Sequence, residues 1–398
     1  MNHPSSAVEI LVVGGGPAGL ATAATAAVCG REVALVHADA EFGRPVRTSG
    51  GAWLSEVRAL GLPTGLYRAV DRLLLAGPTQ RSTVRFGTEQ PVVLDVTATY
   101  QHLAGLATAA GARLYPGHRV TAATTTPRGF RCELGGVTVD CRWIIDATGY
   151  RRTVLQALGH APAWWRLGVG AEVECADEGS AFNGALLFVG HRWAPTGYGW
   201  AFPTPAGRLR LGIGLQRPDS TASPSALLRE FLASSAPAEL GLRPGAVIAR
   251  HGGVVPSAGL ADACRWGRAV GVGDAIGQAR PLVGEGIVAS IQAGRALGAA
   301  LGASQPEAAV DDYWQVWRAG HAAVYARSLA GNHRLSTMSD ERWDESVRRI
   351  GWLRGPAVAT LLRGQLGTAE LVKLAFTNPV GILRYAASKA TSLRRREP

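Results

Sequence analysis

Residues 271–287 combine a short carboxylate with a glycine-containing loop, a pattern suited to the isoalloxazine end of a flavin. An apolar strand predicted at 269–272 leads to Asp274, whose carboxylate can accept hydrogen bonds from ribityl hydroxyls. The loop at 281–286 then brings backbone N–H groups to the start of a helix predicted from Ile287 to about 301. The positive end of that helix would favour the negative charge of a reduced flavin. The alternative interpretation is an ordinary strand, loop and helix.

A second glycine motif lies near the N-terminus, at residues 14–19. An apolar strand predicted at 9–13 precedes it, an alanine-rich helix to about Cys29 follows, and a second strand is predicted at 32–37. Gly-x-Gly-x-x-Gly therefore occurs where a strand–turn–helix unit for a dinucleotide requires it. Gly14 allows a tight turn, Gly16 allows close approach of a pyrophosphate, and Gly19 allows close helix–strand packing.

The end of the second strand departs from the usual dinucleotide pattern. An acid commonly binds the adenosine ribose there, whereas this chain has His37, with Asp39 two residues further on. We expect His37 to contact the ribose, although an ordinary strand-end histidine is the alternative. A third apolar segment, 141–149, includes Asp146 and a turn of small residues that would pass beneath the adenosine half of the cofactor. The three segments are predicted to converge on one dinucleotide.

Composition favours a globular enzyme. The chain has 398 residues, 47% of them apolar, which is enough to build a large core and two lobes. We expect a cytoplasmic protein, because the first strand begins too early for a signal peptide and no apolar run is long enough to span a bilayer. The five cysteines lack metal-site spacing, so no metal is expected. The net charge of +11 comes almost entirely from arginine, and no nucleic-acid-binding pattern accompanies it.

The predicted fold class is α/β, or α+β overall: a Rossmann-like FAD-binding domain with an inserted antiparallel-sheet substrate domain and a C-terminal helical region. The cofactor domain is expected to be discontinuous, and its three parts are residues 7–75, 95–160 and 250–305. The substrate domain would comprise 76–94 and 161–249, where short apolar and alternating runs predict antiparallel strands. Residues 306–398 would be helical. A basic final helix is predicted to end at Arg394–Arg396. It would be either a solvated helix end or, as the more specific hypothesis, a peripheral membrane contact.

Further motifs resemble those of the geranylgeranyl reductase family of FAD-dependent oxidoreductases, within the two-dinucleotide-binding-domain flavoproteins. Residues 197–203 are similar to its Y-x-W-x-F-P element, and 281–287 to its P-x-x-G-E-G-I element. Residues 45–51 and 60–63 are similar to its P-V-R-C segment and L-G-L-P turn, with Thr48 at the cysteine position. The resemblance covers roughly residues 8–303. It implies that the aromatic element lines a cavity above the flavin, although alternating core residues of a strand would give the same pattern.

The sequence and this resemblance together give a set of predicted site residues. The predicted binding residues for non-covalent FAD are Gly14, Gly16, Pro17, Ala18, Gly19, His37, Arg47, Val120, Gly149, Asp274, Pro281, Gly284, Gly286 and Ile287. The predicted substrate-binding residues are Tyr198, Trp200 and Phe202. No catalytic residue is assigned, and Tyr198 and Glu285 are the candidate proton donors, with a structural carboxylate as the alternative for Glu285.

The leading functional hypothesis is an FAD-dependent oxidoreductase that reduces or dehydrogenates a carbon–carbon double bond in a bulky apolar substrate. The main alternative is a flavin monooxygenase of the aromatic-hydroxylase type. Such hydroxylases commonly carry Asp-Gly where this chain has Thr148-Gly149, which disfavours that alternative. A second alternative is a non-redox flavin-dependent cyclase or isomerase. No second nucleotide motif is present, so NAD(P)H acting directly or a reductase partner would supply electrons.

Overall fold

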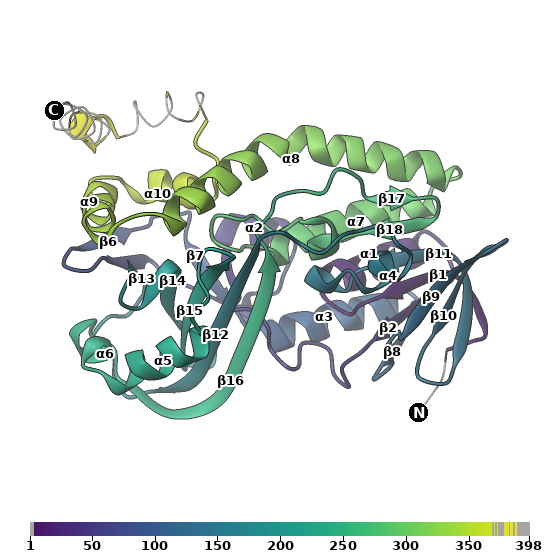
Figure 1. The fold of residues 1–398 in the computed structure, drawn as a ribbon, viewed down its shortest axis with the longest axis horizontal. Helices are drawn as coiled ribbons and strands as arrows, with labels where there is room; N and C mark the ends of the chain where they lie inside the picture. The colour runs from purple at the N-terminus through teal and green to yellow at the C-terminus, as the bar shows by residue number, and fades with distance from the viewer. Residues whose placement is uncertain are drawn as a thin grey trace.

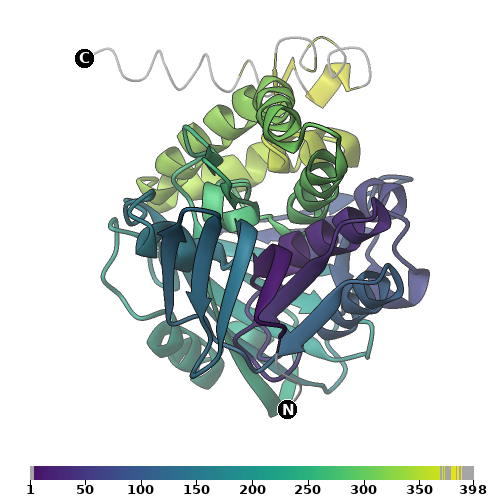
Figure 2. The same ribbon diagram turned by 90° about the vertical axis from the view of Figure 1, so that its right-hand side faces the viewer.

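A computed structural model describes residues 4–367 and several isolated positions between 370 and 387. Two large sheets lie side by side, and helices from the C-terminal third of the chain run along one side of both (Figures 1 and 2). The predicted α/β class is confirmed, because parallel and antiparallel sheets combine with a helical C-terminal region.

The first sheet has eight strands, and its central strands are parallel. In spatial order its main path is β17 (Arg265–Trp266), β18 (Ala269–Gly271), β11 (Thr138–Asp146), β1 (Ala7–Val13), β2 (Val33–His37) and β8 (Arg113–Pro116). The antiparallel strands β9 (Ala122–Thr126) and β10 (Gly129–Glu133) extend from β11. The central strands form near-continuous apolar runs because helices cover the sheet.

The helices that accompany this sheet are α1 (Pro17–Val28), α3 (Val96–Ala109), α4 (Thr153–Ala157) and α7 (Ile287–Gly302). Helices α1 and α7 pack closely because α7 presents glycines to α1. A Cβ at Gly294 would lie 2.3 Å from the Ala18 carbonyl oxygen, and one at Gly298 would lie 2.7 Å from that of Thr22. The contact brings the N-terminal ends of both helices to the same edge of the sheet.

The second sheet is a seven-stranded, mostly antiparallel layer. In spatial order its strands are β16 (Pro244–Pro256), β12 (Leu167–Asp177), β15 (Leu209–Arg217), β14 (Ala194–Pro203), β13 (Ala185–Gly190), β5 (Arg72–Ala76) and β6 (Arg81–Arg85). Helices α5 (Pro224–Ala233) and α6 (Ala236–Glu239) pack on one face through a separate apolar core. The opposite face of β12, β14 and β15 is therefore available for a ligand site.

Three short strands and the C-terminal helices complete the described fold. The small sheet contains β3 (Gly51–Trp53), β7 (Pro91–Leu94) and β4 (Tyr67–Ala69), with α2 (Leu54–Ala59) after β3. The last three helices are α8 (Pro306–Ser336), α9 (Asp340–Ile350) and α10 (Gly355–Leu362). Helix α8 spans much of the molecule above both large sheets in Figure 1. Ser339 caps α9, and its side chain accepts a hydrogen bond from the Arg342 N–H.

Two of the predicted domain boundaries fall inside strands of the second sheet. The boundary at 75/76 cuts β5, and the boundary at 249/250 cuts β16. Both strands belong to the second sheet, because β5 pairs with β13 and β16 pairs with β12. The division into three domains otherwise stays a prediction. The predicted basic C-terminal helix lies outside the described residues at Arg394–Arg396.

Candidate active site

A cavity of about 560 Å³ lies between the two large sheets. Its first wall is the edge at which parallel strands of the first sheet end. Val13 of β1 pairs with Asp146 of β11, which pairs in turn with Gly271 of β18. The three sequence segments predicted to converge are therefore adjacent. Ligands of open parallel sheets bind beyond this edge, where the loops after the strands meet.

The turn between β1 and α1 makes close backbone contacts that leave no room for a side chain at two of its glycines. Gly14 has φ +115°, and a Cβ there would lie 2.2 Å from the carbonyl oxygen of Ala147. A Cβ at Gly19 would lie 1.9 Å from the Gly14 oxygen. Gly16 instead faces open space, with no heavy atom within 4 Å of its Cβ position. The turn thus leaves room beside Gly16 and the first N–H groups of α1, where a pyrophosphate would bind.

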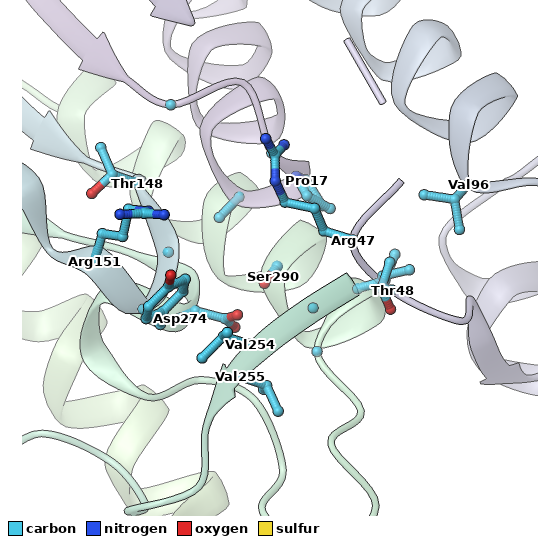
Figure 3. Close-up of a pocket in the computed structure, with 18 of the residues that line it drawn as sticks. Pro17, Arg47, Thr48, Val96, Thr148, Arg151, Val254, Val255, Asp274 and Ser290 are labelled. Atoms are coloured by element: carbon cyan, nitrogen blue, oxygen red, sulfur yellow. The ribbon is translucent and has the colours of Figure 1, made fainter. Parts of the chain in front are cut away.

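Asp274 lies on the far side of the same space (Figure 3). It follows β18 in a short 3-10 turn, and no residue in the described part of the chain is hydrogen-bonded to its carboxylate. Burial raises the pKa of Asp274 to about 6. The N-terminal end of α7 adjoins it through Gly286, Ile287 and Ser290, which also line the cavity. These groups fit a flavin, whose ribityl hydroxyls would satisfy the carboxylate.

His37 is held at the opposite, adenosine end of the site. Its Nδ1 accepts a hydrogen bond from the Gly15 N–H at 3.1 Å, and its ring stacks on Phe42. Nε2 lies 3.4 Å from Asp39, and burial lowers the pKa of His37. Arg47 donates two hydrogen bonds to Asp39, at 2.6 and 3.1 Å. The histidine is therefore a neutral ring whose orientation the protein sets, and it lines the cavity near the Gly14–Gly16 turn.

Most of the predicted FAD-binding residues line this one cavity. They are Gly14, Gly16, Pro17, Ala18, His37, Arg47, Val120, Gly149, Asp274, Gly284, Gly286 and Ile287. Gly19 and Pro281 do not line it. Gly19 packs against the turn backbone, and the Pro281 carbonyl accepts a 2.8 Å hydrogen bond from Asn332 of α8. Their predicted roles are thus limited to shaping the turn and the loop.

The aromatic residues of β14 divide between the cavity and the core. Tyr198 and Trp200 line the cavity, and the Tyr198 hydroxyl donates a 2.6 Å hydrogen bond to the Val283 carbonyl. The Trp200 indole lies over β15, where a Cβ at Gly212 would come within 2.2 Å of it. Phe202 does not line the cavity and packs instead against a neighbouring apolar cluster. Its predicted substrate contact has no support from this geometry.

Glu285, one of the two predicted proton donors, points away from the cavity. Its carboxylate pairs with Arg280 at 2.9 Å, and Arg280 also pairs with Glu56 at 3.0 Å. Burial raises the pKa of Glu285. This arrangement supports the alternative of a structural carboxylate. Tyr198 does line the cavity, but its hydroxyl hydrogen is engaged by Val283.

Sequence reasoning missed a polar cluster on the cavity face of the second sheet. Glu172 and Glu174 of β12 share this face with Arg210 of β15 and His251 of β16. Arg210 donates to Glu174 at 3.0 Å, and the Trp200 N–H donates to Glu172 at 2.7 Å. The available signal was the alternation of charged and apolar residues at 171–175, because a charge at every second position of a buried strand must face a polar neighbour.

The fold and the cavity define an FAD-dependent oxidoreductase: residues 9–166 match the FAD dependent oxidoreductase family, and residues 172–255 match the geranylgeranyl reductase catalytic domain. The chain is 27% identical over 359 residues to digeranylgeranylglycerophospholipid reductase 2 of Methanothermobacter thermautotrophicus, covering 86% of this chain and 91% of that protein. It is 28% identical over 360 residues to menaquinone reductase of Mycolicibacterium smegmatis, covering 83% and 84%. These matches confirm the resemblance of the chain to the geranylgeranyl reductase family of FAD-dependent oxidoreductases.

A solved structure supports the same fold. A geranylgeranyl bacteriochlorophyll reductase-like protein from Thermoplasma acidophilum superposes with a TM-score of 0.80 at 20% identity, covering 96% of this chain and 99% of that one. The family assignment favours a reductase over the monooxygenase and non-redox alternatives. Within the described residues, no helix is both long and apolar enough to cross a membrane.

Proposed function

We propose that this protein reduces isolated carbon–carbon double bonds in an isoprenoid chain, with non-covalently bound FAD as the carrier of hydride. The observation that carries the proposal is the continuity of the cavity. Asp274 and the N-terminal end of α7 line the cavity, as do Val254 and Val255 of the second sheet (Figure 3). Trp200 of the second sheet also lines it. An apolar chain would therefore lie against the second sheet while its double bond faces the flavin.

The relatives support the class of substrate. The matched family is named for geranylgeranyl, an apolar chain with isolated double bonds, and the Methanothermobacter relative is named for a phospholipid carrying two such chains. Electrons would come from NAD(P)H acting directly or from a reductase partner. The basic C-terminal segment would assist the protein at a membrane surface that holds a lipid substrate.

Anaerobic single-turnover measurements test this function. Photoreduced enzyme would be mixed with geranylgeranyl lipids, with their saturated counterparts as the matched control, and with polycyclic aromatic compounds. We expect reoxidation of the flavin by the unsaturated lipids only, with a gain of two hydrogens per double bond by mass spectrometry. Oxygen-dependent hydroxylation of an aromatic compound, with no reoxidation by any isoprenoid, would contradict the proposal.

A further inference from the structure

Glu172 is a buried carboxyl group beside the cavity, and one of its oxygens has no hydrogen-bond partner among the described residues. The residue is 5% exposed and lines the cavity beside Trp200. Its Oε2 accepts the 2.7 Å hydrogen bond from the Trp200 Nε1. Its Oε1 is buried and has no hydrogen-bond partner among the residues that the structure describes. Because burying a charged carboxylate oxygen without a partner is unfavourable, burial favours the neutral carboxyl group with a proton on Oε1.

The surrounding charges leave Glu172 only partly compensated. The nearest cation is Arg210, with its Nε at 3.9 Å, but this guanidinium donates to Glu174 at 3.0 Å. Glu174 also accepts from Arg208 at 2.9 Å, so the ion pairs centre on Glu174. Burial raises the pKa of Glu172 to about 7, with Arg210 acting in the opposite direction. A substantial fraction of Glu172 is therefore protonated at neutral pH.

His251 is the cross-strand neighbour of this carboxyl group. It is directly opposite Glu172 in the pairing of β12 and β16, and it lines the cavity. Its Nε2 lies 4.0 Å from Glu174 and has no hydrogen-bond partner within residues 4–367. Burial, with Arg210 as a second cause, lowers the pKa of His251, which favours the neutral imidazole that can accept a proton and pass it on.

We propose that Glu172 is the acid that protonates the substrate double bond and that His251 returns a proton to Glu172 after each turnover. This assignment rests on the proposed function. Bound FAD, when reduced, would supply a hydride, and with it two electrons, to one alkene carbon. The O–H bond of the Glu172 carboxyl group breaks as its proton joins the other carbon, and the electron pair of that bond stays on the carboxylate. One π bond is thereby replaced by two C–H bonds, and a carboxylate remains. Glu172 retains the Trp200 hydrogen bond in both protonation states, so its position is unchanged.

Glu172→Gln provides the direct test, because glutamine keeps the shape of the side chain and an oxygen to accept from Trp200. We expect normal FAD content and normal dithionite reduction. The rate of flavin reoxidation by the unsaturated lipid should fall by about a hundredfold or more, the usual contribution of a general acid. Glu230→Gln is the matched control, since Glu230 is exposed on α5, which packs on the opposite face of the sheet. It should behave as the wild type.

Two further measurements separate proton donation from a structural role. The wild-type reoxidation rate should fall as the pH rises through about 7, the pKa of Glu172, whereas the slow Glu172→Gln rate should not follow that titration. Infrared difference spectra of the substrate-free protein should contain a protonated-carboxyl band that fades over the same pH range and is absent from the variant. His251→Gln should leave single-turnover reoxidation intact and lower steady-state kcat.

The outcomes distinguish this assignment from the proposed function. If wild-type enzyme is reoxidised by isoprenoid lipids and Glu172→Gln is reoxidised equally fast, Glu172 is not the acid and the proposed function stands. If no isoprenoid reoxidises the wild type, the proposed function fails and the assignment fails with it. If Glu172→Gln loses FAD, the wild-type pH profile and infrared band decide the matter. Absence of either would overturn the assignment.

Discussion

Replacing Asp274 should change cofactor affinity and apo-protein stability in opposite directions. In the FAD-free protein, burial raises the pKa of Asp274 to about 6 from its usual 3.8. This shift means that the ionised carboxylate lowers the free energy of unfolding by about 3 kcal/mol. The side chain retains some contact with solvent, so we reduce this to about 1–2 kcal/mol. This destabilisation develops as the pH rises from about 4 through 6. Asp274→Ala should therefore unfold later than wild type at pH 7, with the difference shrinking toward pH 4.

The same substitution should weaken FAD binding. Losing a hydrogen bond to a charged acceptor costs about 1.5–3 kcal/mol, equivalent to a Kd about 10- to 150-fold higher. Asp274→Asn retains a neutral acceptor and should fall between Asp274→Ala and wild type. Deflavinated proteins would be titrated with FAD by fluorescence, and their unfolding followed in urea at pH 7 and pH 5. Unchanged affinity, or an apo variant less stable than wild type at pH 7, would refute the role of Asp274 as a buried carboxylate that the flavin satisfies.

Three other substitutions test separate parts of the site. Gly16→Val should fold but contain little FAD, because the valine side chain would enter the open space beside the turn. Gly65→Val, on an exposed turn, is the control. Equal FAD content in the two variants would disprove the assignment. Trp200→Ala should keep the flavin spectrum and raise the substrate Kd. A lower melting temperature with an unchanged substrate Kd would instead show that Trp200 is a core residue. Glu285→Gln should lower stability by up to about 3–5 kcal/mol by leaving Arg280 underpaired; a normal melting temperature with abolished turnover would instead favour Glu285 as the donor.

The cofactor half of the site could be predicted from the sequence because its determinants are local. An apolar run ending at Val13, a glycine turn and a helix define their own geometry within a few residues. Asp274 and the start of α7 are likewise positioned by residues close to them in the sequence. The direction of the Glu285 side chain depends on Arg280, which pairs with it and is itself held by Glu56 of α2, a contact that the loop sequence does not specify.

The substrate half depends on strand register, which a single sequence does not specify. Glu172 faces His251 only because β12 and β16 pair in one register, and a shift of one residue would turn Glu172 into the apolar core under α5. Two predicted domain boundaries fall inside strands for a related reason. Apolar runs such as Leu73–Leu75 identify a strand but do not say which sheet it joins.

The incomplete hydrogen bonding of the polar cluster argues for a functional origin. A buried ionic cluster selected for stability alone would satisfy every charged atom or be replaced by apolar side chains at little cost. Glu174 meets that condition, since Arg208 and Arg210 both donate to it. Within the described residues, Glu172, His251 and Glu285 each retain one unpaired buried atom, but only Glu172 and His251 of these three line the cavity. Ion pairing around Glu174 thus keeps Arg210 from fully neutralising Glu172, which holds that carboxyl group near the protonation state that a proton donor to an alkene requires.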